Sequence, residues 1–491
     1  MRYVLALLSA IFSVSCSDGT GNDPVVSIAD QALVERIDKY MMSGVKKGYA
    51  GTLLVAKGGS VILNKGYGLA DQEREIANTP DTIFDIGSDT KQFTAAAIMK
   101  LVDQEKLSTT DTLARFFDEI PNDKAKITIH QLLTHTAGFN QTLGGDFQAA
   151  TKEELLKAAF EGDLLYTDQR YSYSNVGYSI LAAIIEDVSG QEYETYLREN
   201  LWEPAGLTHT GYFFPDLAAQ PVAQGYWHGV RPRGSTAQRY ADDGQISWNL
   251  VGNGGLLSTT ADIYRWIEAL KTDTVLSQSS RDQLFGRHVL AANDPERYLA
   301  YGWVVRTAYE GKTFVYHNGG NNVFFTGFAW YLDGDVTIIY TNNTSVGEWP
   351  TYEVHKMIFE PDYEPQAFSV TPHRVAYDYA RSREDGQLQG LAEHVERETG
   401  EAITDRTLLN LVGIAFEEDG QYETSVALFK FNTELFPNDG YLWSSLGEGY
   451  QVKGDVEQAI ASYEKSLDVA PEEGCDWCEA AQAEIAKLKR L

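Results

Sequence analysis

Apolar residues follow two different spacings between residues 31 and 365. Short apolar runs typical of strands lie near both ends of this region, and helical spacing dominates its middle. The predicted strands are Gly51–Ala56, Val61–Leu63, Thr313–Tyr316, Gly327–Tyr331 and Val336–Tyr340, and the clearest predicted helices are Thr90–Gln104 and Asn175–Ser189. Strands from both ends can join in one sheet, which leaves the helices as an insert. We therefore predict an α+β fold, an antiparallel sheet with a helical insert.

The C-terminal part contains a repeat with a period of 34 residues. The recurring positions pair Leu409, Gly413, Phe416, Gly420, Phe429 and Pro437 with Trp443, Gly447, Tyr450, Gly454, Tyr463 and Pro471. This pattern resembles the tetratricopeptide repeat. We predict an all-α repeat domain over residues 401–491 that ends in a capping helix, with residues 366–400 as a linker or a degenerate repeat. Two interpretations stay open: the repeats bind a protein or peptide partner, or they only stabilise the chain.

The first residues, MRYVLALLSAIFSVSC, carry one early cation, a short apolar run and small residues before Cys16. The run is shorter than the roughly 20 residues that span a bilayer, but it suits a secretory signal. It resembles a bacterial lipoprotein signal at residues 1–15, with Cys16 as the lipidated residue and 16–30 as a linker. A plain cleaved signal is the alternative. We expect an exported protein, periplasmic or anchored to the outer membrane, that touches a membrane only through its lipid.

The composition limits the kinds of molecule and metal that the protein can bind. Forty Lys and Arg against seventy Asp and Glu give a net charge of −30, which disfavours nucleic acid and anionic membrane surfaces. Three cysteines exclude a disulfide-built scaffold. Cys475 and Cys478 form a single CxxC, which offers too few ligands for zinc; in an exported protein we expect them to be oxidised or without function.

One candidate for nucleophilic chemistry is Ser88-Asp89-Thr90-Lys91, which comes just before an apolar helix. Residues at i and i+3 share one helix face, so the hydroxyl and the amine can meet. The positive helix end and burial favour a neutral Lys91, which can accept the Ser88 proton. The S-x-x-K pattern also occurs at Ser43–Lys46 and Ser462–Lys465, so it does not identify a site by itself.

The sequence around this motif identifies it. FDIGSDTKQFTAAAIMKLVD (84–103) closely resembles the nucleophile segment of the serine β-lactamase and penicillin-binding-protein-like hydrolases, which include D-Ala-D-Ala carboxypeptidases and esterases. Further segments agree in the same order: ITIHQLLTHTAGF (127–139), YSYSNVGYSILAAIIEDVSG (171–190), GNGGLLSTTADIYRW (252–266) and YHNGGNNVFFTGFAWY (316–331). The resemblance covers roughly residues 31–350. It implies a small-molecule or peptide substrate, no metal and no cofactor.

The resemblance also assigns catalytic roles. Ser88 matches the acylated nucleophile and Lys91 its base. Tyr173 matches the tyrosine that exchanges protons with the serine and the leaving group. Asn175 would orient the substrate and the Lys91 amine.

The third motif of the family corresponds to His317-Asn318-Gly319. Gly320 would supply one N–H of the oxyanion hole and Ser88 the other. His317 replaces the lysine of β-lactamases, and Asn318 replaces a usual Thr or Ser. Because histidine is largely uncharged above pH 7, we expect poor β-lactam turnover and better activity on uncharged esters or small D-amino-acid amides and peptides.

Two other histidines, His135 in LLTHTAGF and His209 in GLTHTGY, are expected to hold turns rather than to act in catalysis. Two functions remain. The first is an exported serine hydrolase that forms an acyl-enzyme on an amide, ester or lactam bond. The alternative is a catalytically inactive scaffold that binds partners through its repeats.

Overall fold

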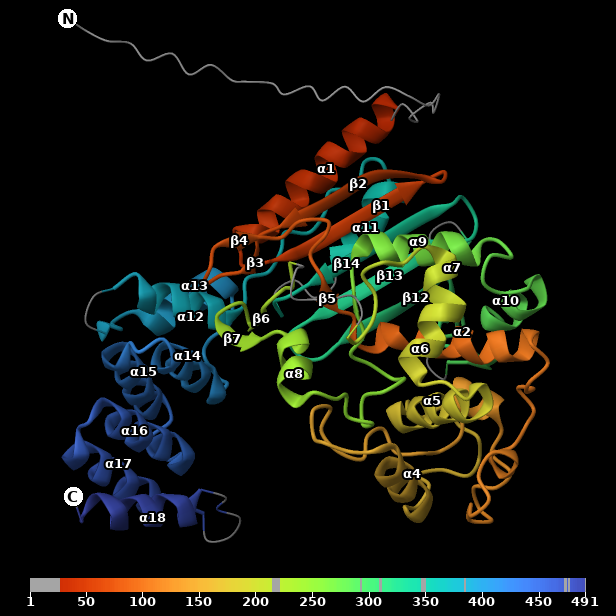
Figure 1. Ribbon diagram of the computed structural model, residues 1–491. Helices are drawn as coiled ribbons and strands as arrows, with labels where there is room; N and C mark the ends of the chain where they lie inside the picture. Colours follow the sequence, from red (N-terminus) through yellow and green to blue (C-terminus); the bar gives the residue numbers. More distant parts are fainter. Residues whose placement is uncertain are drawn as a thin grey trace, which may run out of the picture.

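The computed structural model describes residues 27–213, 221–291, 294–308, 311–345, 350–383, 386–471, 475 and 477–490. The predicted signal and Cys16 lie outside these residues. Residues 31–365, for which the sequence predicts catalysis, are called the catalytic region below. Its centre is a sheet of eight strands in the order β2-β1-β14-β13-β12-β11-β10-β9 (Figure 1). Its strands are β1 (Gly51–Lys57), β2 (Ser60–Tyr67), β9 (Val289–Leu290), β10 (Arg297–Leu299), β11 (Val304–Ala308), β12 (Lys312–Gly320), β13 (Phe325–Tyr331) and β14 (Val336–Asn342).

Every pair of neighbouring strands in this sheet is antiparallel. β1 pairs with β14, so that Gly51 lies opposite Asn342 and strands from the two ends of the catalytic region are neighbours in the sheet. This arrangement confirms the predicted α+β fold.

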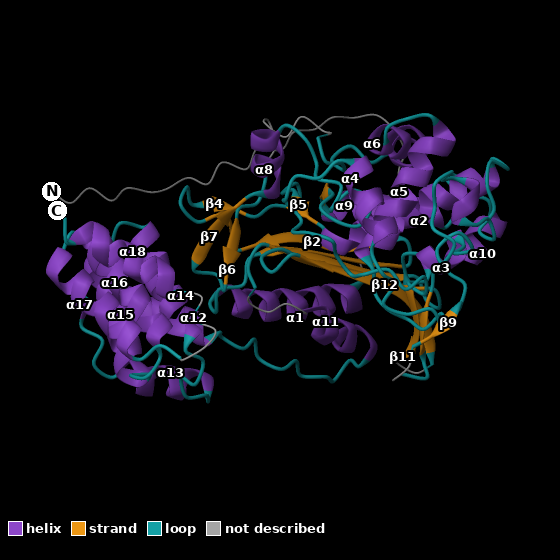
Figure 2. Cartoon of the chain, turned by 90° about the horizontal axis from the view of Figure 1, so that it is seen from below, coloured by secondary structure: helices purple, strands orange, loops and turns teal. Residues whose placement is uncertain are grey.

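Helices cover both faces of the sheet (Figure 2). On one face, α1 (Ile28–Val45) and α11 (Pro350–Phe359) bury apolar side chains against the strands, among them Ile37, Met41 and Met357. On the other face lies the helical insert. Its helices are α2 (Thr90–Asp103), α3 (Ile129–Leu133), α4 (Lys152–Glu161), α5 (Asn175–Ser189), α6 (Tyr193–Leu197), α7 (Glu203–Ala205), α8 (Thr236–Asp243), α9 (Thr260–Leu270) and α10 (Gln278–Leu284).

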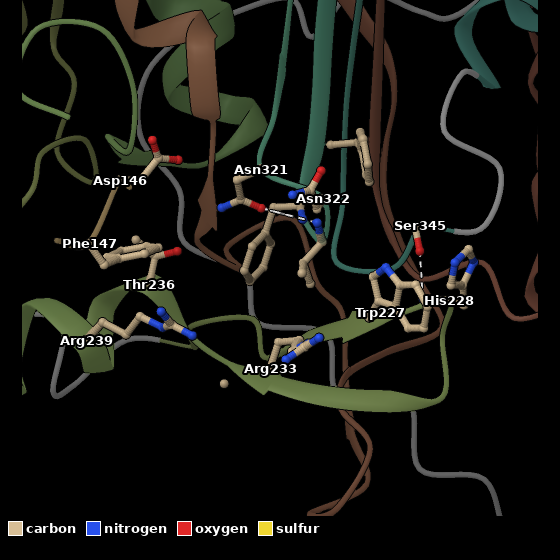
Figure 3. A pocket seen from close by; sticks show the side chains of 14 residues that line it. Asp146, Phe147, Trp227, His228, Arg233, Thr236, Arg239, Asn321, Asn322 and Ser345 are labelled. Carbon is tan, nitrogen blue, oxygen red and sulfur yellow. Dashed lines mark hydrogen bonds between the residues drawn. The ribbon is translucent and has the colours of Figure 1, made fainter. Parts of the chain in front are cut away.

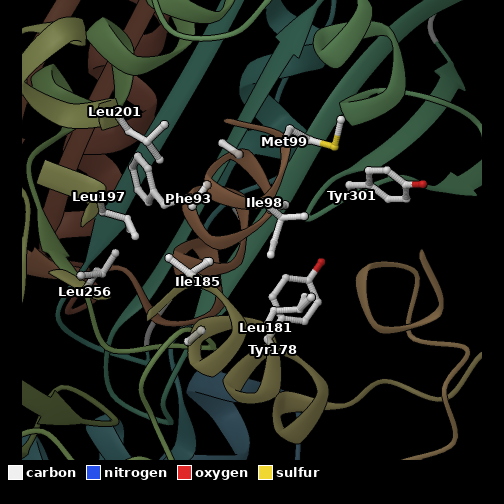
Figure 4. Close-up of a cluster of buried hydrophobic side chains, with 14 of the residues drawn as sticks. Phe93, Ile98, Met99, Tyr178, Leu181, Ile185, Leu197, Leu201, Leu256 and Tyr301 are labelled. Atoms are coloured by element: carbon white, nitrogen blue, oxygen red, sulfur yellow. The ribbon is translucent and has the colours of Figure 1, made fainter. Parts of the chain in front are cut away.

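Helix α2 is buried on almost every side, which is typical of a central helix in a large core. Phe93 and Ile98 from α2 lie among Leu181 and Ile185 from α5 (Figure 4). The N-terminal end of α2 therefore has a fixed place beside the sheet, and this end carries the S-x-x-K motif.

Short elements surround the main sheet. They are β3 (Leu69–Asp71), β4 (Ile76–Ala77), β5 (Phe84–Asp85), β8 (Leu257–Ser258), the hairpin of β6 (Gly225–Trp227) and β7 (Arg231–Gly234), and the 3₁₀ turns η1 (Gly87–Asp89) and η2 (Leu113–Arg115), with a π-helical turn, η3 (Arg198–Trp202). β5 pairs with β8, which brings the segment before Ser88 against residues 257–258.

The C-terminal region is helical, as predicted. Its helices are α12 (Pro372–Arg381), α13 (Leu391–Thr399), α14 (Thr407–Glu418), α15 (Tyr422–Leu435), α16 (Gly440–Lys453), α17 (Val456–Asp468) and α18 (Cys478–Leu488). A disulfide joins Cys475 to Cys478, the first residue of α18.

The 34-residue period has a structural counterpart. A Cβ on Gly413 would lie 2.6 Å from the Phe429 ring, and one on Gly447 would lie 2.8 Å from the Tyr463 ring. Both sites thus have the same contact, in which a large ring fills the space left by a glycine on the preceding helix. The tetratricopeptide identity itself stays a prediction.

The C-terminal helices hold the β6–β7 hairpin. Val230, in the turn of the hairpin, belongs to the buried cluster of α12–α14. Arg231 forms an ion pair with Glu418 of α14 at 2.7 Å, and the His228 ring stacks on His373 of α12 with a centroid distance of 3.8 Å. The position of the hairpin therefore depends on the C-terminal region.

Candidate active site

The turn before α2 approaches the end of β12 unusually closely. Gly87 has φ +49°, and a Cβ there would lie 2.5 Å from the backbone nitrogen of Gly320. A Cβ on Gly319 would lie 1.9 Å from the carbonyl oxygen of Ile86. Both positions require glycine, because any side chain would push the two segments apart. The backbone N–H of Gly320 consequently lies next to the turn that carries Ser88.

The Ser88 hydroxyl has two side-chain partners. The Lys91 Nζ lies 3.2 Å from Ser88 Oγ, and the Tyr173 hydroxyl donates to the same oxygen at 2.9 Å. Lys91 Nζ also donates to the carbonyl oxygen of Asn253 at 2.6 Å, which fixes the amine. The structure thus brings together the three residues that the sequence analysis put forward as the catalytic group.

Burial sets the protonation of these partners. It lowers the pKa of Lys91 to about 7, although the carboxylates of Asp146 and Asp89 act in the opposite direction. Burial raises the pKa of Tyr173 far above neutrality, partly offset by its hydrogen bond to Ser88. Near neutral pH the amine can therefore accept a proton, while the tyrosine keeps its own.

His317 is held by a carboxylate. Its Nδ1 lies 3.1 Å from Asp89 Oδ1, and the other oxygen of Asp89 accepts a hydrogen bond from Thr326 at 2.6 Å. Burial raises the pKa of Asp89, and its hydrogen bond with His317 opposes that effect. The sequence analysis did not assign Asp89 a role, although it stands between Ser88 and Lys91 in the motif.

Asn175 begins α5, after Ser174, whose hydroxyl caps the helix by accepting from the Gly177 N–H at 3.0 Å. The Asn175 side chain lines a small cavity with Ser88, and its buried Oδ1 has no hydrogen-bond partner among the described residues. The sequence analysis expected Asn175 to orient the Lys91 amine as well. In the described part of the chain no hydrogen bond joins the two side chains.

Asn253, rather than Asn175, holds the Lys91 amine. Its carbonyl accepts from Lys91, and its side chain donates to Ser179 at 2.8 Å. The sequence analysis missed this residue, although it lies in the family-like segment GNGGLLS.

The two remaining histidines lie at turns. His135 has φ +58°, and its Nδ1 accepts from the Ser174 backbone N–H at 3.1 Å. Its ring packs 4.5 Å from that of Tyr173, and burial keeps its pKa well below the usual value. The backbone N–H of His209 donates to Asp262 at 2.6 Å. His135 thus supports Tyr173 as an uncharged ring.

Two cavities lie near Ser88. One, of about 180 Å³, is lined by Tyr173, His317, Asn318 and Arg297, among others. The sequence analysis expected uncharged substrates because His317 replaces the lysine of β-lactamases. Arg297, on β10, adds a cation to this cavity that the sequence did not reveal, so a substrate carboxylate can also find a partner here.

A small cavity lined by Ser88 and Asn175 adjoins a larger one of about 600 Å³, because Asp146, Phe147 and Asn321 line both. Figure 3 shows the larger cavity, which Trp227 and Arg233 of the β6–β7 hairpin also line. A molecule bound at Ser88 can therefore extend toward Tyr173 and His317 or toward the β6–β7 hairpin.

The fold and this site define a family. Residues 30–354 match the family model Beta-lactamase, and the chain belongs to the Beta-lactamase family. Among its relatives is the penicillin-binding-protein-like PbpX of Bacillus subtilis (strain 168), 34% identical over 253 residues, which are 51% of this chain and 61% of that protein. The chain thus spans less than two thirds of that relative.

Solved structures share the fold. The octameric penicillin-binding protein homologue from Pyrococcus abyssi is 24% identical with a TM-score of 0.57, over 72% of this chain and 81% of that one. The D-amino acid amidase from Ochrobactrum anthropi SV3 is 19% identical with a TM-score of 0.56, over 67% of this chain and 100% of that one.

Proposed function

We propose that the protein is an exported serine hydrolase that forms an acyl-enzyme at Ser88. The observation that carries this proposal is the pair of hydrogen bonds at Ser88 Oγ, one to Lys91 and one to Tyr173. A nucleophile needs a base within reach and a proton donor for the leaving group. Lys91, with a pKa of about 7, suits the first task, and Tyr173, which keeps its proton, suits the second.

The reaction follows from these positions. Neutral Lys91 takes the Ser88 proton as the Oγ–carbon bond forms at the substrate carbonyl. The N–H groups of Ser88 and Gly320 stabilise the negative oxygen of the tetrahedral intermediate. Tyr173 gives its proton to the leaving group as the old bond breaks, and the proton on Lys91 restores the tyrosine. Water then attacks the acyl-enzyme by the reverse sequence and releases the acid and free Ser88.

The bond attacked is an amide or ester in this proposal, rather than a β-lactam hydrolysed efficiently. The third motif has His317, held by Asp89, in place of the lysine of β-lactamases. The cation that could receive a substrate carboxylate on this side is Arg297 instead, on a different strand.

Mass spectrometry after incubation with a fluorophosphonate tests the proposal. We expect one adduct, on the peptide that contains Ser88, and no adduct in Ser88→Ala. Ser43 and Ser462 provide an internal comparison, because each also begins an S-x-x-K sequence. A label on another serine, or labelling that survives Ser88→Ala, would contradict the assignment. No labelling by fluorophosphonate or penicillin would favour the inactive binding scaffold.

Export through a lipoprotein signal is part of the proposal, and its support is the sequence that ends at Cys16. In the part of the chain that the structure describes, none of the helices has the length and apolar character needed to cross a bilayer. We expect the processed protein to fractionate with membranes. Cys16→Ser should release it or leave the precursor uncut. A soluble processed form of the unmutated chain would refute the lipid but not export.

The C-terminal helices offer a place for a protein or peptide partner. The support is the 34-residue period and its equivalent glycine–ring contacts. A pull-down with residues 366–491 attached to the catalytic region, compared with the same protein lacking residues 401–491, tests this. Equal capture by both would leave the region a stabilising role only.

A further inference from the structure

The 600 Å³ cavity beside the Ser88 site has a strongly cationic wall (Figure 3). Arg233, on β7, and Arg239, on α8, line it from one side, and Asp146 lies on the side toward Ser88. His228 also lines it, but burial lowers its pKa to about 4, so it is uncharged at neutral pH.

Among the described residues, the charge of Glu418 acts on Arg233, but neither arginine has an acidic partner in direct contact. Their guanidinium groups form no ion pair or hydrogen bond with a described carboxylate, whereas Arg231 on the same strand pairs with Glu418. Arg239 instead lies over the Phe147 ring, 4.5 Å from its centroid. The chain has seventy acidic and forty basic residues, so two arginines at one cavity without a direct ion pair to a described residue are unusual in this protein.

The structure around the two arginines keeps their positive charges close to each other. The C-terminal helices fix the hairpin through Val230 and the Arg231–Glu418 ion pair. Desolvation and the neighbouring charges of Arg231 and Arg239 lower the pKa of Arg233, and the charge of Glu418 opposes this effect. A bound anion would relieve this repulsion, and arginine binds a carboxylate through two parallel hydrogen bonds.

The cavity lies on the acyl side of the reaction, if Ser88 acts as proposed above. Tyr173, which protonates the leaving group in that scheme, lines the other cavity, together with His317 and Arg297. The acyl part of the substrate must then point toward Asn175, Asn321 and the larger cavity. We propose that this cavity is an acyl-side subsite in which Arg233 and Arg239 bind a carboxylate carried by the acyl group.

Matched esters test this inference, which rests on the proposed function. The probes are the p-nitrophenyl monoesters of succinic, glutaric and adipic acid, each compared with the p-nitrophenyl ester of an unbranched fatty acid of equal length. The measured quantity is the ratio of kcat/KM for the anionic ester to that for its neutral partner. In Arg233→Gln/Arg239→Gln we expect this ratio to fall about tenfold or more for at least one chain length, mainly through KM. Turnover of the neutral esters should change less than twofold.

Two further variants separate a local contact from a general effect of charge. Arg115→Gln/Lys157→Gln also removes two positive charges, but at exposed positions that line none of these cavities. This variant should leave the ratio unchanged. Arg233→Lys/Arg239→Lys should keep part of the preference. An equal ratio in the Gln variant and the unmutated protein, with neutral esters still hydrolysed, would overturn the subsite alone. Absence of any Ser88 acylation in the unmutated protein would overturn the proposed function with it.

Discussion

In the proposed mechanism, Lys91 makes the activity depend on pH. Burial lowers its pKa from the ordinary 10.5 to about 7, and only the neutral amine can accept the Ser88 proton. With a neutral ester, we expect kcat/KM to rise about tenfold per pH unit below 7 and to level off above about pH 8. A stopped-flow pH profile measures this directly.

A neighbouring carboxylate provides the control for that profile. The charge of Asp146 raises the pKa of Lys91, so Asp146→Asn should move the midpoint of the rise to lower pH. A rate that does not change between pH 5.5 and 9 in the unmutated protein would show that Lys91 is not the base.

Tyr173 should matter through its hydroxyl alone. Tyr173→Phe removes the donor 2.9 Å from Ser88 Oγ, and we expect kcat to fall about 10²-fold, the usual scale for a positioned acid. Tyr178→Phe is the matched control, because that ring also lies near Lys91 but its hydroxyl donates to the Leu133 backbone. Steady-state kinetics that gave equal losses for both variants would argue against a proton-transfer role.

At the scale of elements, we expect the contact between the turn that carries Ser88 and β12 to be the most sensitive to substitution. Gly87→Ala would introduce a Cβ 2.5 Å from the Gly320 nitrogen, at a residue with φ +49°. We expect the rate of Ser88 labelling to fall at least about 10²-fold, because the oxyanion donor is displaced. The free energy of unfolding should fall as well, measured by urea denaturation.

Gly190→Ala is a control that separates the effect of backbone strain at a positive φ from the effect of a steric clash. Gly190 also has a positive φ, +74°, but a Cβ there would meet nothing within 4 Å. This variant should lose only about 1 kcal/mol of stability and keep its labelling rate. If Gly87→Ala behaved the same way, the close approach would have no role in the site.

The same scale shows how far the sequence predicts the structure. β1, β12, β13 and β14 were found from their apolar runs, and helix α5 has the predicted bounds, Asn175–Ser189. β9 and β10 have two and three residues, too few for a period to show.

The residues of the candidate site also fall into two groups, those that the sequence predicts and those that it does not. Ser88, Lys91 and Tyr173 lie in motifs, so the sequence alone pointed to them. Asn253 acts through its backbone carbonyl, and Arg233 and Arg297 reach their cavities only through tertiary packing. No local pattern carries such information, because it depends on which distant segments meet.

At the scale of the whole molecule, the β6–β7 hairpin connects the C-terminal helices to the proposed acyl-side subsite. Glu418→Gln removes the partner of Arg231, two residues from Arg233. Because the negative charge of Glu418 also acts on Arg233, we expect a larger preference for anionic esters, measured as the kcat/KM ratio, with Ser88 labelling unchanged. Glu417→Gln is the matched control, since that side chain forms no ion pair with a described residue.

Deletion of residues 401–491 extends this test. It removes α14 and with it Glu418, while leaving every residue at Ser88 in place. A small fluorophosphonate should still label Ser88. Loss of all labelling or of solubility would mean that the helices complete the fold of the catalytic region.

The position of β1 between β2 and β14 has a consequence for how the chain acquires its structure. The hydroxyls of Thr52 on β1 and Thr341 on β14 lie 2.6 Å apart but are separated by 289 positions. At about 5–20 residues per second, a ribosome needs roughly 15–60 s between them. Pairs this distant in sequence form slowly, so the apolar β1 strand stays without its inner neighbour throughout that interval. Loss of residues 51–67 would in turn leave β14 as a long, exposed apolar edge, the kind of surface that promotes aggregation.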